Sequence, residues 1–240
     1  LNEAAIMAAK DRRRFVRQSD IKSAFIKVGI GAEKRSKVIS DKEKRITAYH
    51  ETGHAILFHV LPHMDPVYTI SIIPTGMGAA GYTMPLPDND EMFNTKNKML
   101  EDITTLLGGR VAEEIIFGDI TTGASNDIKR ATETARSMVM KYGMSEKIGL
   151  IAYGNDDDEV FIGRDLAHTR GYSEEVAREI DGEISRIIRE CHENAESIIR
   201  ENIGVLHSCA ALLLEKEKIH REEFEALFTT EKEEVAKTNE

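Results

Sequence analysis

The sequence is poor in several residue types. Its 240 residues include no tryptophan, two cysteines and five prolines, and only 6% of them are aromatic. The two cysteines, Cys191 and Cys209, form no CxxC motif and no disulfide framework, so a reducing compartment is the default expectation. No apolar run approaches the roughly 18 residues that a membrane-spanning helix needs, and we expect no signal peptide within the sequence given. The chain as given is therefore predicted to be soluble.

The charge balance excludes further classes of partner. The formal net charge is −10, which argues against nucleic acid or an anionic membrane surface as the main partner. Hydrophobic residues make up 41% of the chain and charged residues 31%, a balance that predicts a helix-rich protein with a sizeable core. The length suits one large domain or two small ones.

The N-terminal segment predicts two short helices followed by a linker. Small and apolar residues share one face over Leu1–Arg13, and Ser19 or Asp20 can cap a second helix that ends near Val28. Residues 30–40 are largely polar and charged without clear periodicity, so we place a domain boundary there. The first residue already lies in a helical pattern with no cap before it, so we expect the chain to be a piece of a longer protein.

The rest of the chain predicts helices with a small β element. Ser40 and Glu43 form a capping box that begins a helix over 41–60, which Pro62 ends. The alternating, β-branched segment 67–73 predicts a strand, and 81–86 is briefly extended. Further helices are expected at 95–117, 126–142 and 173–228, the last with breaks near 202–204 and 219–220, together with a small hairpin within 150–163 and a charged, disordered tail at 229–240.

One stretch of the first long helix carries chemistry. Residues 47–60 read TAYHETGHAILFHV and contain an HExxH motif formed by His50, Glu51 and His54. Four residues turn an α-helix by about 400°, so the two imidazoles lie on one face and can both bind one metal ion. Glu51 is placed to reach a water on that metal without being a ligand, and a carboxylate there serves as a general base. Zinc suits imidazole and oxygen ligands and keeps one position open for water, so the motif predicts a hydrolytic zinc site.

Two further histidines near the motif are expected to be structural. His59 points about 140° to 180° away from the HExxH pair on the helix. It lies near the end of the helix, where the dipole favours a basic group. His63 follows Pro62 and lies outside the helix, so neither histidine is predicted to bind the metal.

The spacing leaves the third ligand open. An HExxHxxGxxH extension would need histidine at position 60, where the sequence has Val60. A carboxylate from a later helix is then required, and the candidates are Glu113, Glu114 and Asp127. Asp127 is favoured because it stands at a helix start behind a turn-rich loop that can fold over a metal. A carboxylate in the first turn of a helix is also common without any metal, because it interacts favourably with the helix dipole.

The motifs, taken in order, resemble those of the FtsH family of membrane-anchored, ATP-dependent zinc proteases. The segments LNEAAIMAAKDRR and SDIKSAF are similar to the end of the family's AAA helical lid, and ITAYHETGHA is similar to its HExxH helix. DPVYTISIIPTG and AAGYTMPLP resemble the strand and the Gly-rich segment that follow, and LLGGRVAEEIIFGDITTGASNDIKRAT resembles the family's most specific stretch. Thr52 and Tyr68 depart from the family's usual residues, but neither is a proposed ligand.

The resemblance implies a fold and a division of the chain. The implied fold is mainly α, a helical zinc-peptidase domain with a small β element, preceded by a remnant of a helical AAA lid. The implied segments are the lid end at 1–32, a linker at 33–40, the zinc peptidase domain at 41–228 and the tail at 229–240.

For the site, the resemblance implies that Asp127 joins His50 and His54 as the third ligand of Zn²⁺. Glu51 is then the catalytic residue of a metalloendopeptidase, and the glutamates at 113 and 114 take supporting or structural roles. The strand at 67–73 or the extended piece at 81–86 is expected to pair with the substrate backbone.

The resemblance also implies partners that lie outside this chain. No GxxxxGK[ST] phosphate loop is present, so ATP and Mg²⁺ are expected only on an ATPase module upstream of Leu1. The expected substrates are unfolded or membrane-extracted proteins. The full-length protein is expected to be a hexamer anchored in a membrane, with this domain on the cytoplasmic side or its matrix or stroma equivalent. The alternative is an assembly module with a vestigial metal site, in which the helices at 95–117 and 173–228 hold a ring together.

Overall fold

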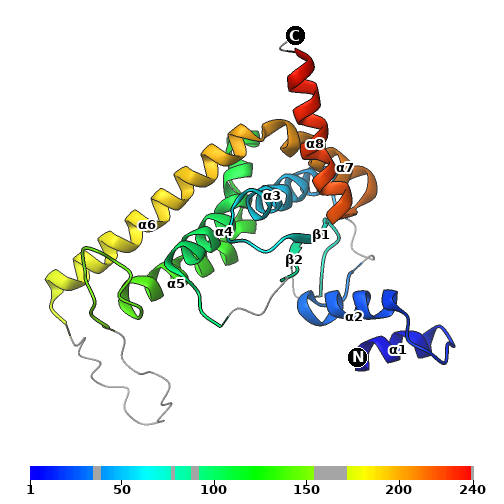
Figure 1. Cartoon of the computed structure of the whole chain (residues 1–240), viewed down its shortest axis with the longest axis horizontal. Helices are drawn as coiled ribbons and strands as arrows, with labels where there is room; N and C mark the ends of the chain where they lie inside the picture. Colours follow the sequence, from blue (N-terminus) through cyan, green and yellow to red (C-terminus); the bar gives the residue numbers. More distant parts are fainter. Residues whose placement is uncertain (35–38, 77–78, 88–91, 154–171, 239–240) are drawn as a thin grey trace.

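The computed structural model describes residues 1–34, 39–76, 79–87, 92–153 and 172–238, with side chains up to Thr229. It is mainly helical with one small sheet (Figure 1), as the sequence predicts. The helices are α1 (Asn2–Lys10), α2 (Gln18–Ile30), α3 (Asp41–Val60), α4 (Lys96–Phe117), α5 (Ser125–Met140), α6 (Glu174–Glu201), α7 (Ile203–Lys216) and α8 (Arg221–Thr238). The strands are β1 (Val67–Ser71), β2 (Tyr82–Pro85) and β3 (Lys218–His220).

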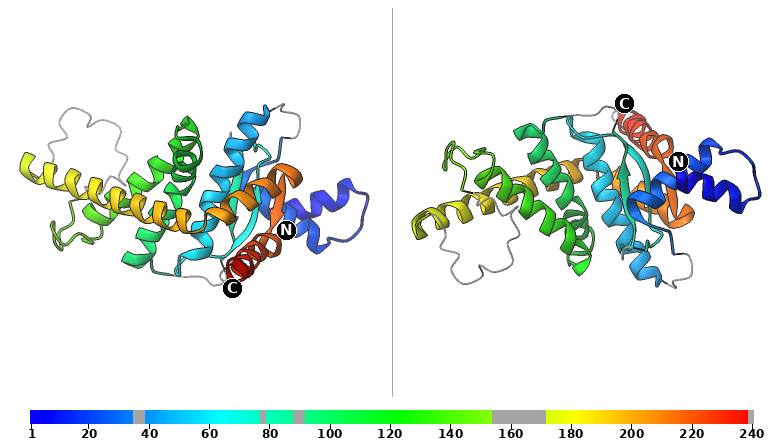
Figure 2. Two further views of the ribbon diagram at one scale, coloured as in Figure 1. Left: turned by 90° about the horizontal axis from the view of Figure 1, so that it is seen from above. Right: turned by 90° about the horizontal axis from the view of Figure 1, so that it is seen from below.

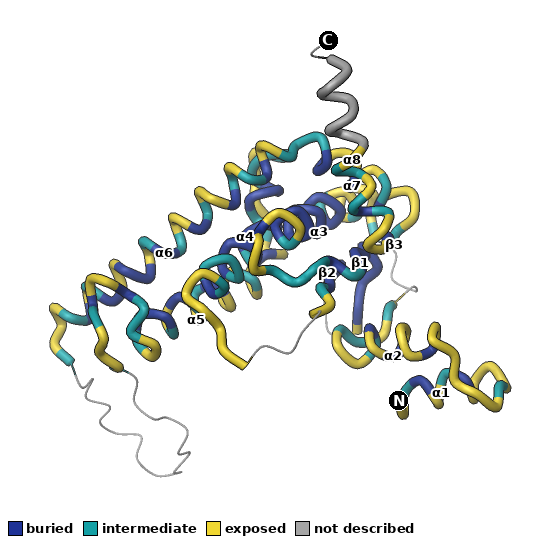
Figure 3. The backbone as a smooth tube through the Cα atoms, in the orientation of Figure 1, coloured by how far each residue is buried: buried dark blue, intermediate teal, exposed yellow. Residues whose placement is uncertain are grey.

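The first two helices form a pair beside the rest of the chain, and most of their residues are exposed (Figure 3). α1 and α2 pack on each other through small buried alanines. The Arg13 guanidinium donates hydrogen bonds of 2.7 and 2.6 Å to the two oxygens of Asp20, which fixes the turn between the helices. α1 ends at Lys10, before the predicted end, because Arg12 adopts a left-handed φ of 55°.

α3 is the central helix, and it begins as predicted. The Ser40 hydroxyl accepts from the Glu43 N–H, and the Glu43 carboxylate accepts from the Ser40 N–H, which together form a capping box. α3 packs against α4, and the two helices touch at Gly53 and Gly108. A Cβ on Gly53 would clash with the Gly108 carbonyl oxygen, so no larger residue fits at this contact. The HExxH face of α3 is thereby brought against α4.

A three-stranded antiparallel sheet lies beside α3 in the order β2-β1-β3. β1 corresponds to the strand predicted at 67–73, and β2 corresponds to the extended piece predicted at 81–86. β3 was not predicted: it pairs with Thr69–Ser71 at a point where the sequence indicates only a helix break. Three residues are too few for an alternating pattern to identify a strand.

Two hydrophobic clusters fill the body of the protein. One lies among α3, β1, the end of α6, α7 and α8, and it includes the fully buried Leu206, Leu213 and Phe224. The other joins α4, α5 and the first part of α6 through residues such as Ile103 and Met138. α6 contacts α3, α4 and α5, and it passes across α3 (Figure 2). None of the described helices is by itself long and apolar enough to cross a membrane, and α6 and α7 reach that criterion only as a pair bent by 79°.

The remaining predicted boundaries differ in detail. The helix expected at 126–142 runs over Ser125–Met140 and follows a 3-10 turn at Thr122–Ala124. The helix expected to end near 228 continues to Thr238, into the stretch predicted as a disordered tail. The predicted hairpin within 150–163 falls largely on residues 154–171, which lie outside the described residues. The division into lid end, linker, peptidase domain and tail stays a prediction.

Candidate metal centre

The two histidines of the HExxH motif lie one turn apart on the face of α3 that meets α4. Their Nε2 atoms are 3.1 Å apart, and the rings meet edge to face with their centroids 4.8 Å apart. His54 is buried and His50 is partly buried. The spacing of four residues therefore places two imidazole nitrogens at one point.

Each imidazole is held from α4 through its other ring nitrogen. His50 Nδ1 lies 2.8 Å from Glu113 Oε1, and His54 Nδ1 lies 2.7 Å from the Thr105 carbonyl oxygen. A carboxylate and a carbonyl only accept hydrogen bonds, so both Nδ1 atoms donate. The Nε2 lone pairs are then the ones that face a metal ion, and the two oxygen partners fix the direction of each ring.

The backbone of α4 leaves room for the His50 ring. A Cβ on Gly109 would lie 2.5 Å from His50 Nε2 and 2.6 Å from its Nδ1. Any side chain at this position would displace the imidazole. The paired glycines of the LLGGRVAEE segment thus serve the centre together, Gly108 at the contact between the helices and Gly109 beneath His50.

Asp127 reaches the same point from the start of α5. Its Oδ2 lies 3.5 Å from His50 Nε2 and 3.7 Å from His54 Nε2. The loop before α5 is tied to α4 by Glu113, whose carboxylate accepts hydrogen bonds from the backbone N–H and the hydroxyl of Thr121. One buried glutamate therefore holds both a histidine of α3 and the loop that delivers Asp127.

The donor set fits zinc. One nitrogen each from His50 and His54 and one oxygen from Asp127 all lie within 4.8 Å of one another. Ligands at about 2.0–2.1 Å from a tetrahedral zinc ion are about 3.3–3.4 Å apart. The observed separations of 3.1, 3.5 and 3.7 Å lie on either side of that value. Two imidazoles and one carboxylate leave the fourth position of a tetrahedron open, which is the pattern of catalytic rather than structural zinc sites.

The protonation of this cluster also favours a cation at its centre. Burial lowers the pKa of His50, but hydrogen bonds with Asp127 and Glu113 outweigh burial and raise that pKa to about 10. Burial, and next the positive charge of His50, lower the pKa of His54 to about 4. The carboxylates therefore hold one positive charge among the two rings, and a divalent cation at this point would take the place of that proton.

Glu51 lies next to the three donor groups but is not one of them. It interacts electrostatically with His50 and Asp127, and burial raises its pKa to about 7. Its Oε2 accepts a hydrogen bond of 2.9 Å from the hydroxyl of Thr83 in β2. A buried carboxyl group with a pKa near neutrality can both take up and release a proton, which is the requirement for general acid–base catalysis.

The two other histidines near the motif and Glu114 lie elsewhere. His59 stacks on an aromatic ring of α8 at a centroid distance of 4.1 Å, and His63 Nδ1 lies 2.6 Å from a carboxylate oxygen of Glu101. Glu114 pairs with Arg110 one turn before it on α4. Among the residues that the structure describes, none of these joins the cluster of three donor groups.

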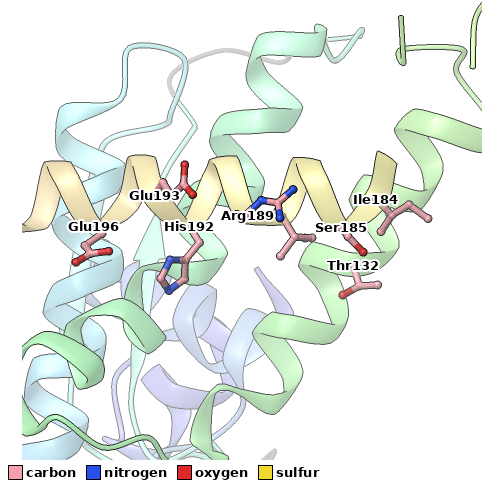
Figure 4. A pocket seen from close by; sticks show the side chains of 8 residues that line it. Thr132, Ile184, Ser185, Arg189, His192, Glu193 and Glu196 are labelled. Carbon is pink, nitrogen blue, oxygen red and sulfur yellow. The ribbon is translucent and has the colours of Figure 1, made fainter. Parts of the chain in front are cut away.

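A hollow between α5 and α6 is separate from the metal centre (Figure 4). Its lining consists of Thr132 on α5 and a row of residues on α6, namely Ile184, Ser185, Ile188, Arg189, His192, Glu193 and Glu196. None of them belongs to the HExxH motif or to the cluster around it. His192 Nε2 lies 2.9 Å from Glu114 Oε2, so the polar groups here join α6 to α4, and we assign no reaction to this hollow.

Sequence reasoning misses most of the groups that orient the centre. The sequence offers the glutamates of GGRVAEE only as alternative ligands or as supporting residues. In the structure Glu113 accepts a hydrogen bond from His50 Nδ1 and so orients that imidazole. Thr105 acts through its backbone carbonyl, which no side-chain pattern reveals. Thr83 is remote from Glu51 in the sequence, and only the packing of β2 on α3 joins them.

Comparisons with known proteins find similar sequences over most of the chain. The profile of peptidase family M41 matches residues 37–227. A protein named ATP-dependent zinc metalloprotease FtsH from Caldicellulosiruptor bescii is 53% identical over 227 residues, which are 95% of this chain and 37% of that protein. The corresponding FtsH 1 of a Thermoanaerobacter species is 50% identical over 231 residues, 96% of this chain and 38% of that protein. FtsH of Thermotoga maritima is 47% identical over 235 residues, and the chain spans only 38% of its length.

Proposed function

The chain belongs to peptidase family M41, and we propose on this premise that it is the zinc-dependent endopeptidase part of a longer ATP-dependent protease. Relatives about half identical to it are named ATP-dependent zinc metalloproteases. The observation that carries the proposal is the convergence of His50, His54 and Asp127, whose donor atoms lie within 4.8 Å of one another. The buried carboxylate of Glu51 beside them supplies the acid–base group.

His50, His54 and Asp127 are the proposed ligands. Zinc, when bound, supplies a Lewis acid that polarises a peptide carbonyl and activates water at neutral pH. Glu113 and the Thr105 carbonyl oxygen keep the two imidazoles aimed at the metal and keep their Nδ1 atoms protonated.

Glu51 is the proposed catalytic residue. Its carboxylate accepts a proton from the water that attacks the scissile carbonyl, and it then returns that proton to the leaving amide nitrogen. The burial of Glu51 beside the three donor groups and the hydrogen bond from Thr83 to its Oε2 support this role. Because Glu51 is not a ligand, its loss should remove proton transfer without removing the metal.

β2 is the proposed partner of the substrate backbone. Of the two segments that the sequence offers for this role, β1 lies between β2 and β3 and is paired on both sides, whereas β2 is an outer strand. An outer strand can bind an extended peptide through backbone hydrogen bonds with little sequence preference. β2 also carries Thr83, so a peptide along it passes close to Glu51.

The proposal extends to the longer protein. We place ATP and Mg²⁺ on an upstream ATPase module, and a membrane anchor upstream of this chain, with the peptidase on the cytoplasmic side or its matrix or stroma equivalent. The substrates would be unfolded or membrane-extracted proteins, and the assembly a hexamer. The relatives are named ATP-dependent, which supports the ATPase module, and the chain spans only 37–38% of their length, which leaves room for further segments. The alternative of an assembly module with a vestigial metal site is not favoured, because the donor set and its orienting partners are all present.

Elemental analysis combined with casein cleavage tests the proposal. The unchanged chain should contain stoichiometric zinc and cleave casein without ATP. Glu51→Gln should keep its zinc and lose cleavage, whereas Asp127→Ala should lose both. His59→Ala is the control: it changes a histidine of the same helix that faces α8, so zinc and cleavage should both remain.

Each variant also has an outcome that contradicts part of the proposal. Cleavage by Glu51→Gln would remove Glu51 from the reaction. Unchanged zinc content in Asp127→Ala would return the choice of ligand to Glu113 and Glu114. An unchanged chain that binds no zinc and cleaves nothing would favour the assembly module.

A further inference from the structure

The carboxylate of Glu51 is held by a strand as well as by its own helix. The Thr83 hydroxyl of β2 lies 2.9 Å from Glu51 Oε2 and 2.9 Å from the Glu51 carbonyl oxygen. Within the part of the chain that the structure describes, no other group donates a hydrogen bond to this carboxylate. A hydroxyl has one proton to donate, so the two acceptors share it, and both belong to residue 51.

The backbone directly before β2 also contacts the side chain of Glu51, at Gly81. A Cβ on Gly81 would lie 3.0 Å from Glu51 Cγ and 2.6 Å from the Ser71 carbonyl oxygen. Because Gly81 has no side chain, the backbone before β2 lies directly against the methylene groups of Glu51. The side chain is therefore held at Cγ by packing and at Oε2 by a hydrogen bond.

The strand that makes these contacts is itself anchored. Tyr82 and Met84, the neighbours of Thr83, are buried in a cluster with Ile26 of α2. Side chains alternate between the two faces of a strand, so these contacts leave Thr83 on the face toward α3. The Tyr82 hydroxyl also donates to Glu33 at 3.0 Å. Thr83 is thus presented to Glu51 by a packed element rather than by a loop.

We propose that Thr83 is a positioning residue for the peptidase reaction and that its hydroxyl fixes the rotation of the Glu51 carboxylate. The proposal rests on the proposed role of Glu51 in catalysis. The last torsion of a glutamate side chain has a broad distribution, so a carboxylate without partners takes many orientations. Proton transfer needs only one of them, and a small misplacement of a reacting group lowers a rate by about 100-fold.

The test compares three single variants of the whole chain. Thr83→Val keeps the β-branched shape and removes the hydroxyl, whereas Thr83→Ser keeps the hydroxyl. Thr69→Val is the matched control, because the Thr69 hydroxyl in the neighbouring strand is buried and donates to the Ile219 carbonyl oxygen at 2.9 Å rather than to Glu51. For each variant, kcat and KM for casein cleavage, zinc affinity by competition with a chelator, and melting temperature are measured.

For Thr83→Val, kcat should fall about 10- to 100-fold, the range for one hydrogen bond to a charged group. KM and zinc affinity should stay within about twofold, since neither depends on the rotation of this carboxylate. Thr83→Ser should recover kcat to within about threefold of the unchanged chain. Thr69→Val should retain its kcat although its melting temperature falls.

Several results would overturn the role of Thr83. One is an unchanged kcat in Thr83→Val, and another is a Thr83→Ser chain as slow as Thr83→Val. A loss of zinc affinity or of cooperative melting in Thr83→Val also counts against it, because the residue would then act on the metal centre or the fold. Failure of the underlying function looks different, since Glu51→Gln would then retain cleavage. If Glu51→Gln is inactive and Thr83→Val is fully active, only the role of Thr83 is lost.

Discussion

Replacing Glu113 by glutamine should weaken zinc binding about 10- to 100-fold while leaving all three proposed ligands in place. The Glu113 carboxylate accepts hydrogen bonds from three donors: His50 Nδ1 at 2.8 Å, the Thr121 backbone N–H at 2.8 Å and the Thr121 hydroxyl at 3.1 Å. Glutamine has the same shape but only one oxygen, and its NH₂ group donates. Either the Nδ1–H of His50 or the backbone N–H of Thr121 must therefore face the NH₂ group of the new glutamine, which is also a donor.

Both orientations of the new amide harm the centre. If its oxygen faces His50, the NH₂ group opposes the Thr121 N–H and loosens the loop that delivers Asp127. If its oxygen faces Thr121, the NH₂ group opposes the Nδ1–H of His50. The imidazole must then shift its proton to Nε2, the atom that faces the metal. Either result costs about 1.4–2.7 kcal/mol of metal-binding free energy, which is the same 10- to 100-fold range.

Glu114→Gln is the matched control for this measurement. Glu114 is the next residue on α4, is partly exposed, and pairs with Arg110 and His192 away from the metal. Its zinc affinity should stay within about twofold of the unchanged chain. Chelator competition at fixed pH measures both affinities, and far-UV circular dichroism checks that the fold is kept. Equal affinities for Glu113→Gln and the unchanged chain would refute the reasoning, and complete loss of zinc would move Glu113 into the ligand set.

Three further predictions concern packing and charge. Gly109→Ala should weaken zinc binding at least about 10-fold, because the new Cβ would lie 2.5 Å from the His50 imidazole. Gly182→Ala is the control: this glycine of α6 has nothing within 4 Å, so the change should leave zinc affinity unchanged and stabilise the fold by about 0.5–1 kcal/mol. Hydrogen bonds from Arg13 lower the pKa of Asp20 from 3.8 to about 2, so the stability from this pair is present above about pH 4 and is lost as the pH falls toward 2. Asp20→Asn should therefore melt below the unchanged chain at about pH 6, with a gap that closes in acid, and a gap that persists at about pH 2 contradicts the assignment. Phe224→Ala, at a fully buried position, should lower the free energy of unfolding in urea by about 3–5 kcal/mol, and a loss under about 1 kcal/mol would show that the site is poorly packed.

The parts of the structure that follow from the sequence are the local ones. The capping box of Ser40 and Glu43 and the shared face of His50 and His54 depend only on residues three and four positions apart. The start of α4 after Thr95 and its end before Gly118, which adopts a left-handed φ of 60°, likewise follow from single capping residues. Such features need no knowledge of the tertiary fold.

The parts that could not be predicted depend on contacts between distant segments. Spacing alone left Glu113, Glu114 and Asp127 as possible ligands, and the resemblance to a family was needed to choose among them. All three lie near the end of α4 or the start of α5, and the choice depends on how closely α4 approaches α3. β3 was missed for a related reason, since a strand of three residues is defined by its partner and not by its own pattern.

α4 supplies none of the proposed ligands, and yet it places every one of them. Through Glu113 and the carbonyl oxygen of Thr105 it holds the two imidazoles of α3, and through Glu113 it also holds the loop before Asp127. Its packing against α3, α5 and α6 is therefore part of the metal centre. A site assembled from rigid helices keeps its geometry only while the helix that orients them is packed. Metal binding and the integrity of the core around α4 are thus linked: zinc that binds only the folded arrangement stabilises that arrangement, and loosening of α4 lowers the affinity for zinc.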